Sequence, residues 1–389
     1  MQNEPTVRSV FILGCKGVPA RYGGFETFVD NLVTRRTSDG IRYYVACMSD
    51  RDAVEPYGAA TCFHIRVPQV GSAKAVLYDL LAFRRFLRYI RKNRLEGCII
   101  YVLACRLGPF FPALKRAAAK LGAKVYVNPD GHEWKRSKWS RPIKAYWKYS
   151  EGKMVRDADL LICDSVNIER YIREEYSGYS PATTFIAYGA AVPCPAQDEE
   201  PYHRWLEKNG LREKEYDLIV GRFVPENNYQ TMIEGFMASG TKKALVLVTD
   251  VKRNAFFEVL ERQTGMSRDG RVRFVGTVYD APLLAQIRRG AFAYLHGHEV
   301  GGTNPSLLEA LAATELNLLL DVPFNREVGG DGALYFPKDA QRLARLLDEA
   351  DRLPAAERER LRQNAVRRIR EQYSWEKIVG EYERLFQRA

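Results

Sequence analysis

The sequence predicts an α/β fold made of two Rossmann-like domains whose parallel sheets face an interdomain cleft. Short apolar runs rich in β-branched residues alternate with longer amphipathic patterns, which is typical of sheets covered by helices on both faces. The alternation stops once, at the acidic, proline-containing segment 189–202, and then restarts. Because 389 residues exceed one ordinary domain, we expect domains at 1–190 and 191–372, followed by a helical segment, 373–389.

The expected strands follow this alternation in both halves of the chain. In the first half they are Val7–Leu13, Tyr43–Cys47, Phe63–Val67, Cys98–Leu103, Lys124–Asn128, Leu160–Cys163 and Thr184–Ala187. In the second half they are Asp217–Val220, Ala244–Thr249, Val272–Val275, Phe292–His296 and Leu316–Leu320. Ligands of such sheets bind at the carboxyl ends of the strands, so the loops that follow strands are the candidate sites.

The composition is that of a globular protein, with 46% hydrophobic and 28% charged residues. No apolar run approaches the roughly 18–20 residues of a membrane span, and the N-terminus lacks the pattern of a signal peptide. The seven cysteines are scattered without a CxxC pair, so we expect small core residues in a reducing cytoplasm. Asp157-Ala158-Asp159 matches the metal-binding DxD pattern only superficially, and we expect no metal.

The net charge of +11 is unevenly distributed. Residues 1–190 hold 30 Lys and Arg against 18 Asp and Glu, whereas residues 191–389 hold 29 against 30. A basic half attracts the phosphates of nucleic acid, anionic lipid or a soluble substrate. Within it, Leu77–Arg94 has one apolar and one basic face, the latter with Arg84, Arg85, Arg88, Arg91 and Lys92. This segment is either a solvated helix of the fold or a membrane-surface helix. Aromatic residues interleaved with cations between 134 and 149 fit a membrane interface or nucleic acid.

The segment His298–Glu309 (HEVGGTNPSLLE) is a glycine-rich turn that runs into an apolar helix. Glycines let a ligand approach the backbone, and the amides at a helix N-terminus attract anions. A carboxylate one to two turns into the helix accepts hydrogen bonds from hydroxyls. We therefore expect a sugar or nucleoside diphosphate there. The residues assigned to the donor from this segment are Gly301, Gly302, Thr303, Asn304 and Glu309.

Four other loops that follow expected strands carry candidate residues. Arg222, just after Asp217–Val220, is expected to bind a diphosphate in a bidentate manner, and Tyr279 lies near a glycine turn suited to a base. The Gly23-Gly24 pair ends a long glycine-rich turn that is neither GxGxxG nor a Walker A loop. His132, flanked by Asp130 and Glu133, offers acid–base or hydrogen-bonding groups for hydroxyls.

These motifs together resemble retaining glycosyltransferase family 4, whose fold is GT-B. The strings GCKGVPARYGGFETFVDNL, NPDGHEWKRSKW, LICDS, GRFVPENN and GGTNPSLLEA are similar, more specifically, to the bacterial rhamnosyltransferases of capsule and cell-wall polysaccharide assembly. This resemblance spans residues 8–315. Two positions depart from the broad family: Gly301 stands where it has the first glutamate of E-x7-E, and Asn227 where it has a lysine. Diphosphate binding then depends more on Arg222 and backbone amides.

The resemblance implies a dTDP-β-L-rhamnose donor, retention without a metal or protein nucleophile, and a sugar-diphosphate-polyprenol acceptor. It implies a cytoplasmic enzyme at the inner face of the bacterial membrane, with segment 373–389 packed on the first domain. It gives catalytic roles to His132 and Arg222, and adds Gly23, Gly24 and Asn227 to the donor site. The acceptor would contact Tyr22, Glu26, Asp130 and Glu133.

Other readings of the sequence remain open. A second nucleotide-sugar enzyme on the same fold, such as a UDP-hexose transferase or a 2-epimerase, would use the same loops. A nucleic-acid-binding protein or a catalytically silent scaffold would use the basic half instead. Nucleic acid is the weaker expectation, because the diphosphate features lie in the neutral half.

Overall fold

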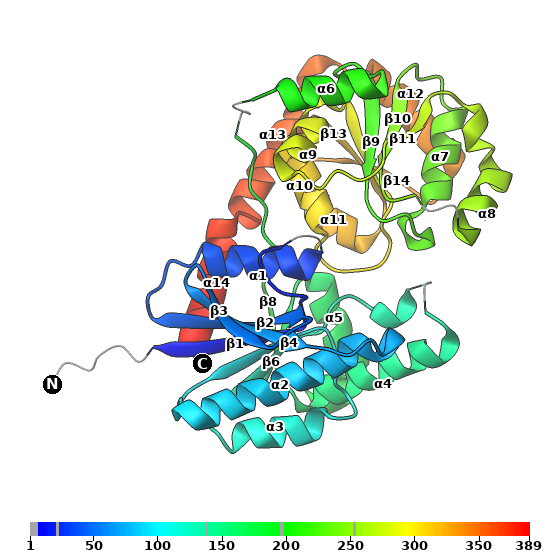
Figure 1. The fold of residues 1–389 in the computed structure, drawn as a ribbon. Helices are drawn as coiled ribbons and strands as arrows, with labels where there is room; N and C mark the ends of the chain where they lie inside the picture. The colour runs from blue at the N-terminus through cyan, green and yellow to red at the C-terminus, as the bar shows by residue number, and fades with distance from the viewer. Residues whose placement is uncertain (1–6, 21–22, 137–138, 195–197, 252–253) are drawn as a thin grey trace. The chain divides into compact units, whose positions relative to one another are not determined.

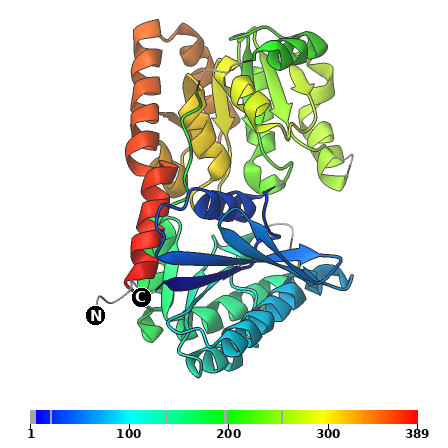
Figure 2. The ribbon, with the colours of Figure 1, turned by 60° about the vertical axis from the view of Figure 1, so that its left-hand side comes forward.

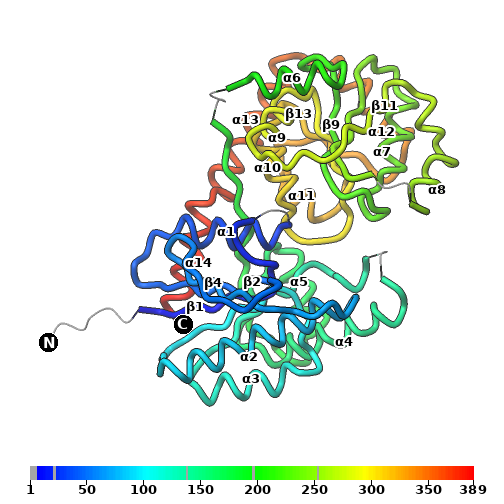
Figure 3. The backbone as a smooth tube through the Cα atoms, in the orientation of Figure 1, coloured from blue at the N-terminus to red at the C-terminus, as the bar shows by residue number. Residues whose placement is uncertain are grey.

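The computed structural model describes residues 7–20, 23–136, 139–194, 198–251 and 254–389, which form two α/β units (Figure 1). The first unit holds the described residues up to Lys135, Trp139–Gly189 and Trp375–Ala389. The second unit holds Ala190–Ser374 together with Arg136. Apart from the short excursion at Arg136, the chain changes unit after Gly189 and after Ser374, and its path can be followed in Figure 3.

The first unit is built on an eight-stranded sheet with the order β3-β4-β2-β1-β5-β6-β7-β8. All neighbouring strands are parallel except the β3–β4 pair. The strands are β1 (Arg8–Leu13), β2 (Ile41–Ser49), β3 (Ala53–Tyr57), β4 (Ala60–Arg66), β5 (Ile99–Leu103), β6 (Lys124–Asn128), β7 (Leu160–Cys163) and β8 (Thr183–Phe185). β1 and β5 are almost wholly buried, as strands with helices on both faces must be.

The second unit is built on a six-stranded parallel sheet with the order β11-β10-β9-β12-β13-β14. The strands are β9 (Tyr216–Val220), β10 (Ala244–Val248), β11 (Val272–Phe274), β12 (Ala293–His296), β13 (Leu316–Leu320) and β14 (Leu334–Phe336). Its core joins the apolar side chains of these strands to those of the flanking helices, with Phe236 and Leu343 fully buried. Each sheet is thus a separate hydrophobic layer with its own carboxyl edge.

Helices cover both faces of each sheet. Those of the first unit are α1 (Gly24–Thr34), α2 (Lys74–Asn93), α3 (Phe111–Ala119), α4 (Arg141–Asp157), α5 (Val166–Glu175) and α14 (Trp375–Gln387). Those of the second are α6 (Glu200–Asn209), α7 (Tyr229–Ala238), α8 (Ala255–Thr264), α9 (Ala281–Gly290), α10 (Pro305–Ala313), α11 (Pro323–Gly329), α12 (Ala340–Arg352) and α13 (Ala355–Gln372).

The C-terminal helix α14 packs against the first sheet. Figure 2 shows it in red alongside the blue strands β1 and β2. The Tyr382 hydroxyl lies 3.1 Å from that of Tyr101 on β5, and both side chains are buried. The Glu383 carboxylate accepts hydrogen bonds from the Thr37 amide (2.9 Å) and hydroxyl (2.6 Å). These buried contacts fasten the end of the chain to the first unit.

Sequence reasoning found twelve of the fourteen strands present in the described residues, and the α/β fold class it predicted is confirmed. It missed β3 and β14. β3 is an antiparallel edge strand that contains Glu55 and Pro56, so it has no apolar run to detect. β14 has only three residues. The ends of several other strands differ by one to three residues, where short-range patterns are least informative.

The topology of each sheet marks one place for a ligand. In the first sheet β1 lies between β2 and β5, and in the second β9 lies between β10 and β12. Successive crossovers therefore leave in opposite directions from β1 and from β9. Open α/β sheets bind ligands in the crevice that forms at the carboxyl ends of such strands. The candidate loops with Gly23-Gly24, Arg222 and Gly301-Gly302 follow β1, β9 and β12, whereas those with His132 and Tyr279 follow β6 and β11.

Two negative findings apply to the part of the chain that the structure describes. No helix there is long and apolar enough to span a bilayer. The same residues contain no cluster of His, Cys, Asp and Glu able to hold a metal ion. Six of the cysteines are buried and Cys194 is exposed.

Candidate functional site

The loop after β9 is closed by its own side chains. The Asn227 side-chain amide donates to the Arg222 carbonyl (2.8 Å), and the Tyr229 hydroxyl donates to the Gly221 carbonyl (3.1 Å). The Asn228 side chain reaches the next loop and donates to the Gly297 carbonyl (2.8 Å). Asn227, which was assigned to the donor, is buried and braces this turn.

Arg222 is exposed at the tip of that turn. Its side chain makes no hydrogen bond or ion pair with any residue in the described ranges. The guanidinium nevertheless lies close enough to His298 for its charge to lower the pKa of that imidazole. The turn therefore presents an uncommitted, planar cation at the carboxyl edge of the sheet, with the geometry that binds diphosphate oxygens in pairs.

Two stacked histidines end β12. The rings of His296 and His298 lie 4.5 Å apart and 13° from parallel. Burial is the main cause that lowers the pKa of His298, to about 3, and it lowers that of His296 as well. Both imidazoles are therefore neutral near pH 7. They therefore add no charge to the loop.

The glycine turn after β12 is open. Gly301 has φ 142°, a conformation that favours glycine, and a Cβ built there would meet nothing within 4 Å. The Gly301 and Gly302 amides donate no hydrogen bond within the described part of the chain. Thr303 is buried next to them. The two glycine amides are thus available to an anion.

The first amides of α10 are not available. Asn304 caps the helix, and its side-chain oxygen accepts from the Ser306 amide (2.9 Å) and the Leu307 amide (3.3 Å). Pro305 has no amide hydrogen. The expectation that the first helical amides face the ligand is therefore wrong, because the helix satisfies them internally. Asn304 acts as a cap at this position.

Glu309 is held by an arginine that sequence reasoning missed. The Arg288 guanidinium lies 2.7 Å from the Glu309 carboxylate and donates to the Ser306 hydroxyl (3.3 Å). Only 5% of the Arg288 side chain is exposed, against 44% for Glu309. A buried cation thus fixes one oxygen of a carboxylate that faces solvent. Arg288 ends α9, a part of the chain with no motif, so no sequence signal identified it.

Glu299 and Tyr279 have contrasting surroundings. Glu299, two residues before the position of the family's usual glutamate, bonds to Lys338 (2.8 Å) and to the Asn228 side chain (3.0 Å). Its carboxylate therefore links loops of the sheet. Tyr279 follows β11 and is 71% exposed, so its ring is accessible to a ligand.

In the first unit, the turn after β1 is fixed by a buried ion pair. Arg106 donates to the Gly14 carbonyl (2.8 Å) and lies 3.1 Å from the Asp79 carboxylate, which is fully buried. Burial raises the pKa of Asp79 to about 6, and Arg106 opposes that rise. A Cβ on Gly14 would lie 2.2 Å from the Leu103 carbonyl oxygen, so only glycine fits against β5.

The Gly23-Gly24 end of that turn is braced by Glu26. The Glu26 carboxylate accepts from the Lys16 amide (2.7 Å). Gly23 has φ 125°, and a Cβ there would lie 1.9 Å from Glu26 Oε2. Gly24 is the first residue of α1. Glu26, assigned to the acceptor, therefore already serves the loop, and Tyr22 lies outside the described residues.

The loop after β6 holds two non-glycine residues in the left-handed region. Asp130 has φ 59° and His132 has φ 49°, and each such residue costs on the order of 1–3 kcal/mol. His132 is buried against the ring of Tyr171, with ring centroids 4.1 Å apart. Burial, assisted by Lys135 and Lys148, lowers the pKa of His132 to about 4. It is a neutral imidazole at pH 7.

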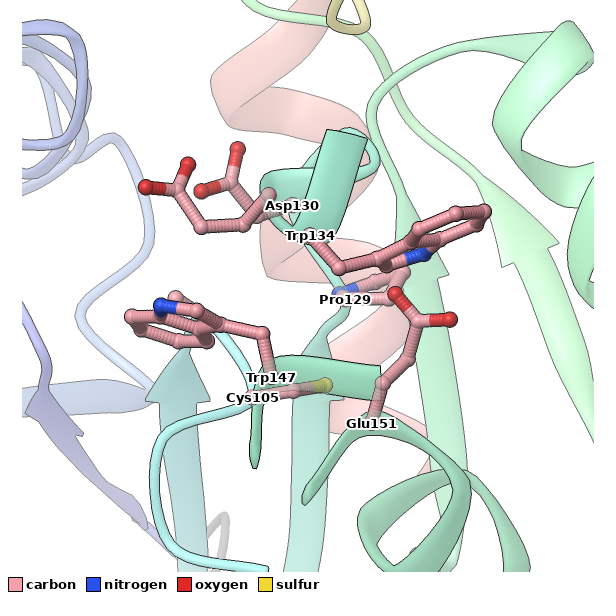
Figure 4. A pocket seen from close by; sticks show the side chains of 8 residues that line it. Cys105, Pro129, Asp130, Trp134, Trp147 and Glu151 are labelled. Atoms are coloured by element: carbon pink, nitrogen blue, oxygen red, sulfur yellow. The ribbon is translucent and has the colours of Figure 1, made fainter. Parts of the chain in front are cut away.

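A small pocket opens beside this loop (Figure 4). Its volume of about 10 Å³ suffices for one water molecule. Asp130, Trp134, Trp147 and Glu151 lie around it. Glu133 also lines it and accepts from the Trp139 indole (2.8 Å). The predicted residues Asp130 and Glu133 therefore line the same pocket. Trp134 and Trp147, which belong to the aromatic segment expected at a membrane interface or on nucleic acid, line it as well.

The basic face of α2 is largely free of partners. Arg84, Arg88, Arg91 and Lys92 are exposed and form no ion pair within the described residues. Arg85 differs, because it is half-buried and lies 2.9 Å from Asp52. The opposite face buries Phe83, Phe86 and Ile90 in the core. Four of the five predicted cations thus remain available to an external anionic surface.

The chain is similar to one protein family in sequence and to several solved structures in fold. Residues 7–191 match the family described as "Domain of unknown function (DUF1972)". No curated protein sequence matches the chain. A sucrose-phosphate synthase from Thermosynechococcus elongatus has 17% identity, a TM-score of 0.76 and coverage of 98% of both chains. A trehalose-phosphate synthase (UDP-forming) from Burkholderia xenovorans in complex with glucose-6-phosphate has 14% identity, a TM-score of 0.72 and coverage of 97% of this chain and 100% of that one.

A third structure, described as trehalose-6-phosphate from E. coli bound with UDP-2-fluoro glucose, has 13% identity and a TM-score of 0.70. It covers 98% of this chain and 99% of that one. The fold is GT-B. Identities this low establish the arrangement of the chain and leave its activity to the residues of the site.

Proposed function

We propose that the chain is a glycosyltransferase that uses a nucleotide-sugar donor. The observation that carries this proposal is the carboxyl edge of the second sheet. There the uncommitted Arg222 and the open Gly301 and Gly302 amides offer donors for a diphosphate, and the carboxylate of Glu309 is held nearby. The structures of the same fold described as synthases of sugar phosphates, and the one bound with UDP-2-fluoro glucose, support this choice.

The chemistry follows from where charge develops. The bond between the anomeric carbon and the phosphate oxygen breaks, and the acceptor hydroxyl oxygen forms a new bond to the same carbon. Negative charge grows on the departing diphosphate, and that diphosphate takes up the proton released by the acceptor hydroxyl. Preorganised donors such as Arg222 and the glycine amides stabilise that charge. Glu309 accepts from a pentose hydroxyl of the nucleotide, which in dTDP is the 3′-hydroxyl of deoxyribose. His132, neutral and buried, exchanges a hydrogen bond with a sugar hydroxyl, and Asp130 accepts from the acceptor.

The donor we propose is dTDP-β-L-rhamnose, transferred with retention and without a metal. The support is the sequence resemblance, including Gly301 at the position of the broad family's first glutamate. The acceptor we propose is a sugar-diphosphate-polyprenol in polysaccharide assembly at the inner membrane face. The exposed cations Arg84, Arg88 and Arg91 support a substrate presented at an anionic surface.

A crossed donor and acceptor panel tests the function. The donors are dTDP-L-rhamnose, UDP-glucose and GDP-mannose, and the acceptors are a synthetic sugar-diphosphate-lipid and glucose 6-phosphate. Mass detection of a rhamnosylated lipid supports the full proposal. A product only from UDP-glucose supports a glycosyltransferase but contradicts rhamnose as the donor sugar. A product only on glucose 6-phosphate contradicts the lipid-linked acceptor. No transfer from any donor, with intact Tm, overturns the proposal.

The membrane component has a separate test. Replacement of Arg84, Arg88 and Arg91 by glutamine is expected to weaken binding to phosphatidylglycerol vesicles, because each cation near such a surface contributes about 1 kcal/mol. Activity on a soluble acceptor analogue should remain. The matched control replaces the exposed cations Lys120, Lys124 and Arg170 of the same unit. Equal loss in both triple variants, or tighter binding to DNA than to vesicles, contradicts a membrane role.

A further inference from the structure

The second unit has a surface groove at the edge of its sheet opposite to the candidate donor loops. Lys214, Arg289 and Glu315 line it, and they precede β9, β12 and β13, whereas the donor loops follow the strands. One face of α13 forms a wall. Glu359, Arg362 and Arg370 are the charged residues of that face.

The groove is the size of a small-molecule site. Its volume of about 540 Å³ lies within the roughly 300–1,000 Å³ typical of ligand pockets. Ala312, Ala313 and Val366 provide an apolar surface, and Pro193 closes one side. A groove with an apolar floor and charged walls is suited to an organic molecule with one ionised group.

The charges of the lining favour an anion. Four cations face two carboxylates, so the lining carries a net charge of +2. Lys214 is committed, because its ammonium donates to the Arg289 carbonyl (2.6 Å) and lies 3.4 Å from Glu315. Arg370 is exposed and makes no ion pair or hydrogen bond with the described residues.

Arg362 is the second available cation. Its guanidinium pairs with Glu359 at 2.7 Å, but both side chains are more than 40% exposed. The pair is bidentate, with both contacts at 2.7 Å, so a ligand phosphate would take Arg362 in competition with the Glu359 carboxylate. Arg362 and Arg370 lie on the same face of α13, about two turns apart.

We propose that this groove binds a phosphomonoester, that is, one phosphate dianion attached to an uncharged organic group. The phosphate would contact Arg362 and Arg370 and neutralise the excess charge of the lining. The organic group would lie over Val366 and the two alanines. The site is separate from the donor loops, and it stands or falls independently of the proposed transfer reaction.

The position of the groove gives its occupant a structural effect. The Ala190 amide donates to the Tyr373 carbonyl (2.7 Å), so the two segments through which the chain leaves this unit are bonded to each other. Val192 and Pro193 follow the first of these segments, and Arg370 precedes the second. A ligand in the groove would contact both segments and slow the breaking of the hydrogen bond between them.

Titration calorimetry with ribose 5-phosphate and with inorganic phosphate tests the site. We expect Arg370→Glu to raise the Kd for ribose 5-phosphate at least tenfold. Arg360→Glu, an exposed arginine of the same helix outside the groove, should stay within twofold of wild type. Ala355→Glu, which places a negative charge in the groove, is the second variant and should weaken binding likewise.

Hydrogen exchange provides the location. In wild type, ribose 5-phosphate should slow exchange of peptides that cover Ala190–Cys194 and Val366–Tyr373, and this protection should be absent in Arg370→Glu. No saturable binding up to about 10 mM overturns the proposal. So does equal weakening in the Arg370 and Arg360 variants, or binding that Arg222→Ala abolishes while Arg370→Glu leaves it intact, because that result places the ligand at the donor loops.

Discussion

The two carboxyl edges of the molecule use polar side chains differently. At the edge of the first sheet, nearly every candidate group is already bonded: Glu26 to the Lys16 amide, Glu133 to Trp139, and Arg106 to Gly14 and Asp79. At the edge of the second sheet, Arg222 and two glycine amides have no partner within the described residues. The polar groups of the first edge stabilise its loops, whereas the second edge has hydrogen-bond donors that are available to an anion.

This difference indicates which substitutions act on binding and which act on the framework. A group without an internal partner can be removed without disturbing the fold, so its loss should change kcat or KM. Removal of a group that braces a loop should first lower the free energy of unfolding. The same residue types, carboxylates and arginines, therefore have opposite expected signatures in the two units.

The largest expected effect belongs to Arg222. Arg222→Ala removes one preorganised donor from the departing diphosphate, and such losses cost about 100- to 1,000-fold in kcat. Stability should change little, because the side chain is exposed and unpaired. Steady-state kinetics and thermal unfolding measure the two quantities.

Two variants sharpen this result. Arg222→Lys keeps the charge and loses the planar fork, so it should recover only part of the activity. Arg262→Ala removes an exposed arginine of α8 away from the loop and should have no effect. A near-wild-type kcat for Arg222→Ala would contradict a role of the second sheet's carboxyl edge in stabilising the departing diphosphate.

Arg288 should give a smaller effect in the same unit. We expect Arg288→Gln to raise the donor KM about tenfold, the equivalent of roughly 1.4 kcal/mol, with a smaller change in kcat. The reason is that Glu309 loses the buried partner 2.7 Å away that fixes its carboxylate. Arg288→Lys should restore part of the affinity.

The role of Arg288 as a positioning residue has its own signature. Wild type should bind dTDP better than 2′,3′-dideoxythymidine diphosphate, which lacks the 3′-hydroxyl of deoxyribose from which Glu309 would accept a hydrogen bond. That preference should shrink in Arg288→Gln and in Glu309→Gln. An unchanged preference with lower stability would give Arg288 a purely structural role.

The sequence contains more local signal at the second edge than at the first, for a physical reason. Glycine turns and an isolated arginine after a strand are local patterns, so Arg222, Gly301 and Gly302 could be proposed as donor contacts from the sequence. The groups that fix neighbouring residues come from distant segments: Arg288 from α9 pairs with Glu309, and Arg106 from the loop after β5, paired with Asp79 from α2, holds the turn at Gly14. Such partners depend on tertiary packing, and no spacing rule connects them. Asn304 is the cap that precedes α10 and Glu26 lies in the first turn of α1, and their hydrogen-bond partners could not be foreseen from the sequence.

Glu26 tests whether the first edge is a framework. Glu26→Ala leaves the Lys16 amide without its acceptor, which should lower the free energy of unfolding by about 1 kcal/mol. The acceptor KM should stay within about twofold. Glu26→Gln keeps an acceptor oxygen and is the matched control for stability in urea. A tenfold rise in acceptor KM with unchanged stability would instead make Glu26 a substrate contact.

The last effect depends on pH and contrasts the buried aspartates of the two units. Asp79 is paired with Arg106, whereas neither carboxylate oxygen of Asp217 has a hydrogen-bond partner of normal geometry in the described residues. Burial raises the pKa of Asp217 to about 7, and Lys243, which pairs with Asp351 at 2.6 Å, opposes that rise only in part. The unfolded chain titrates near the ordinary value of 3.8, so the folded state binds the extra proton between about pH 4 and pH 7.

The sign of the pH dependence follows from this proton. Asp217 should decrease stability as pH rises from about 4 to 7, by at most about 1.4 kcal/mol per unit. Asp217→Asn, which cannot ionise, should remove that slope and be more stable relative to wild type at pH 8 than at pH 5. Asp79→Asn should destabilise at both pH values, since it leaves Arg106 without its buried counter-ion. Urea unfolding across this range measures all three proteins, and parallel curves for wild type and Asp217→Asn would show that Asp217 is ionised in the folded state.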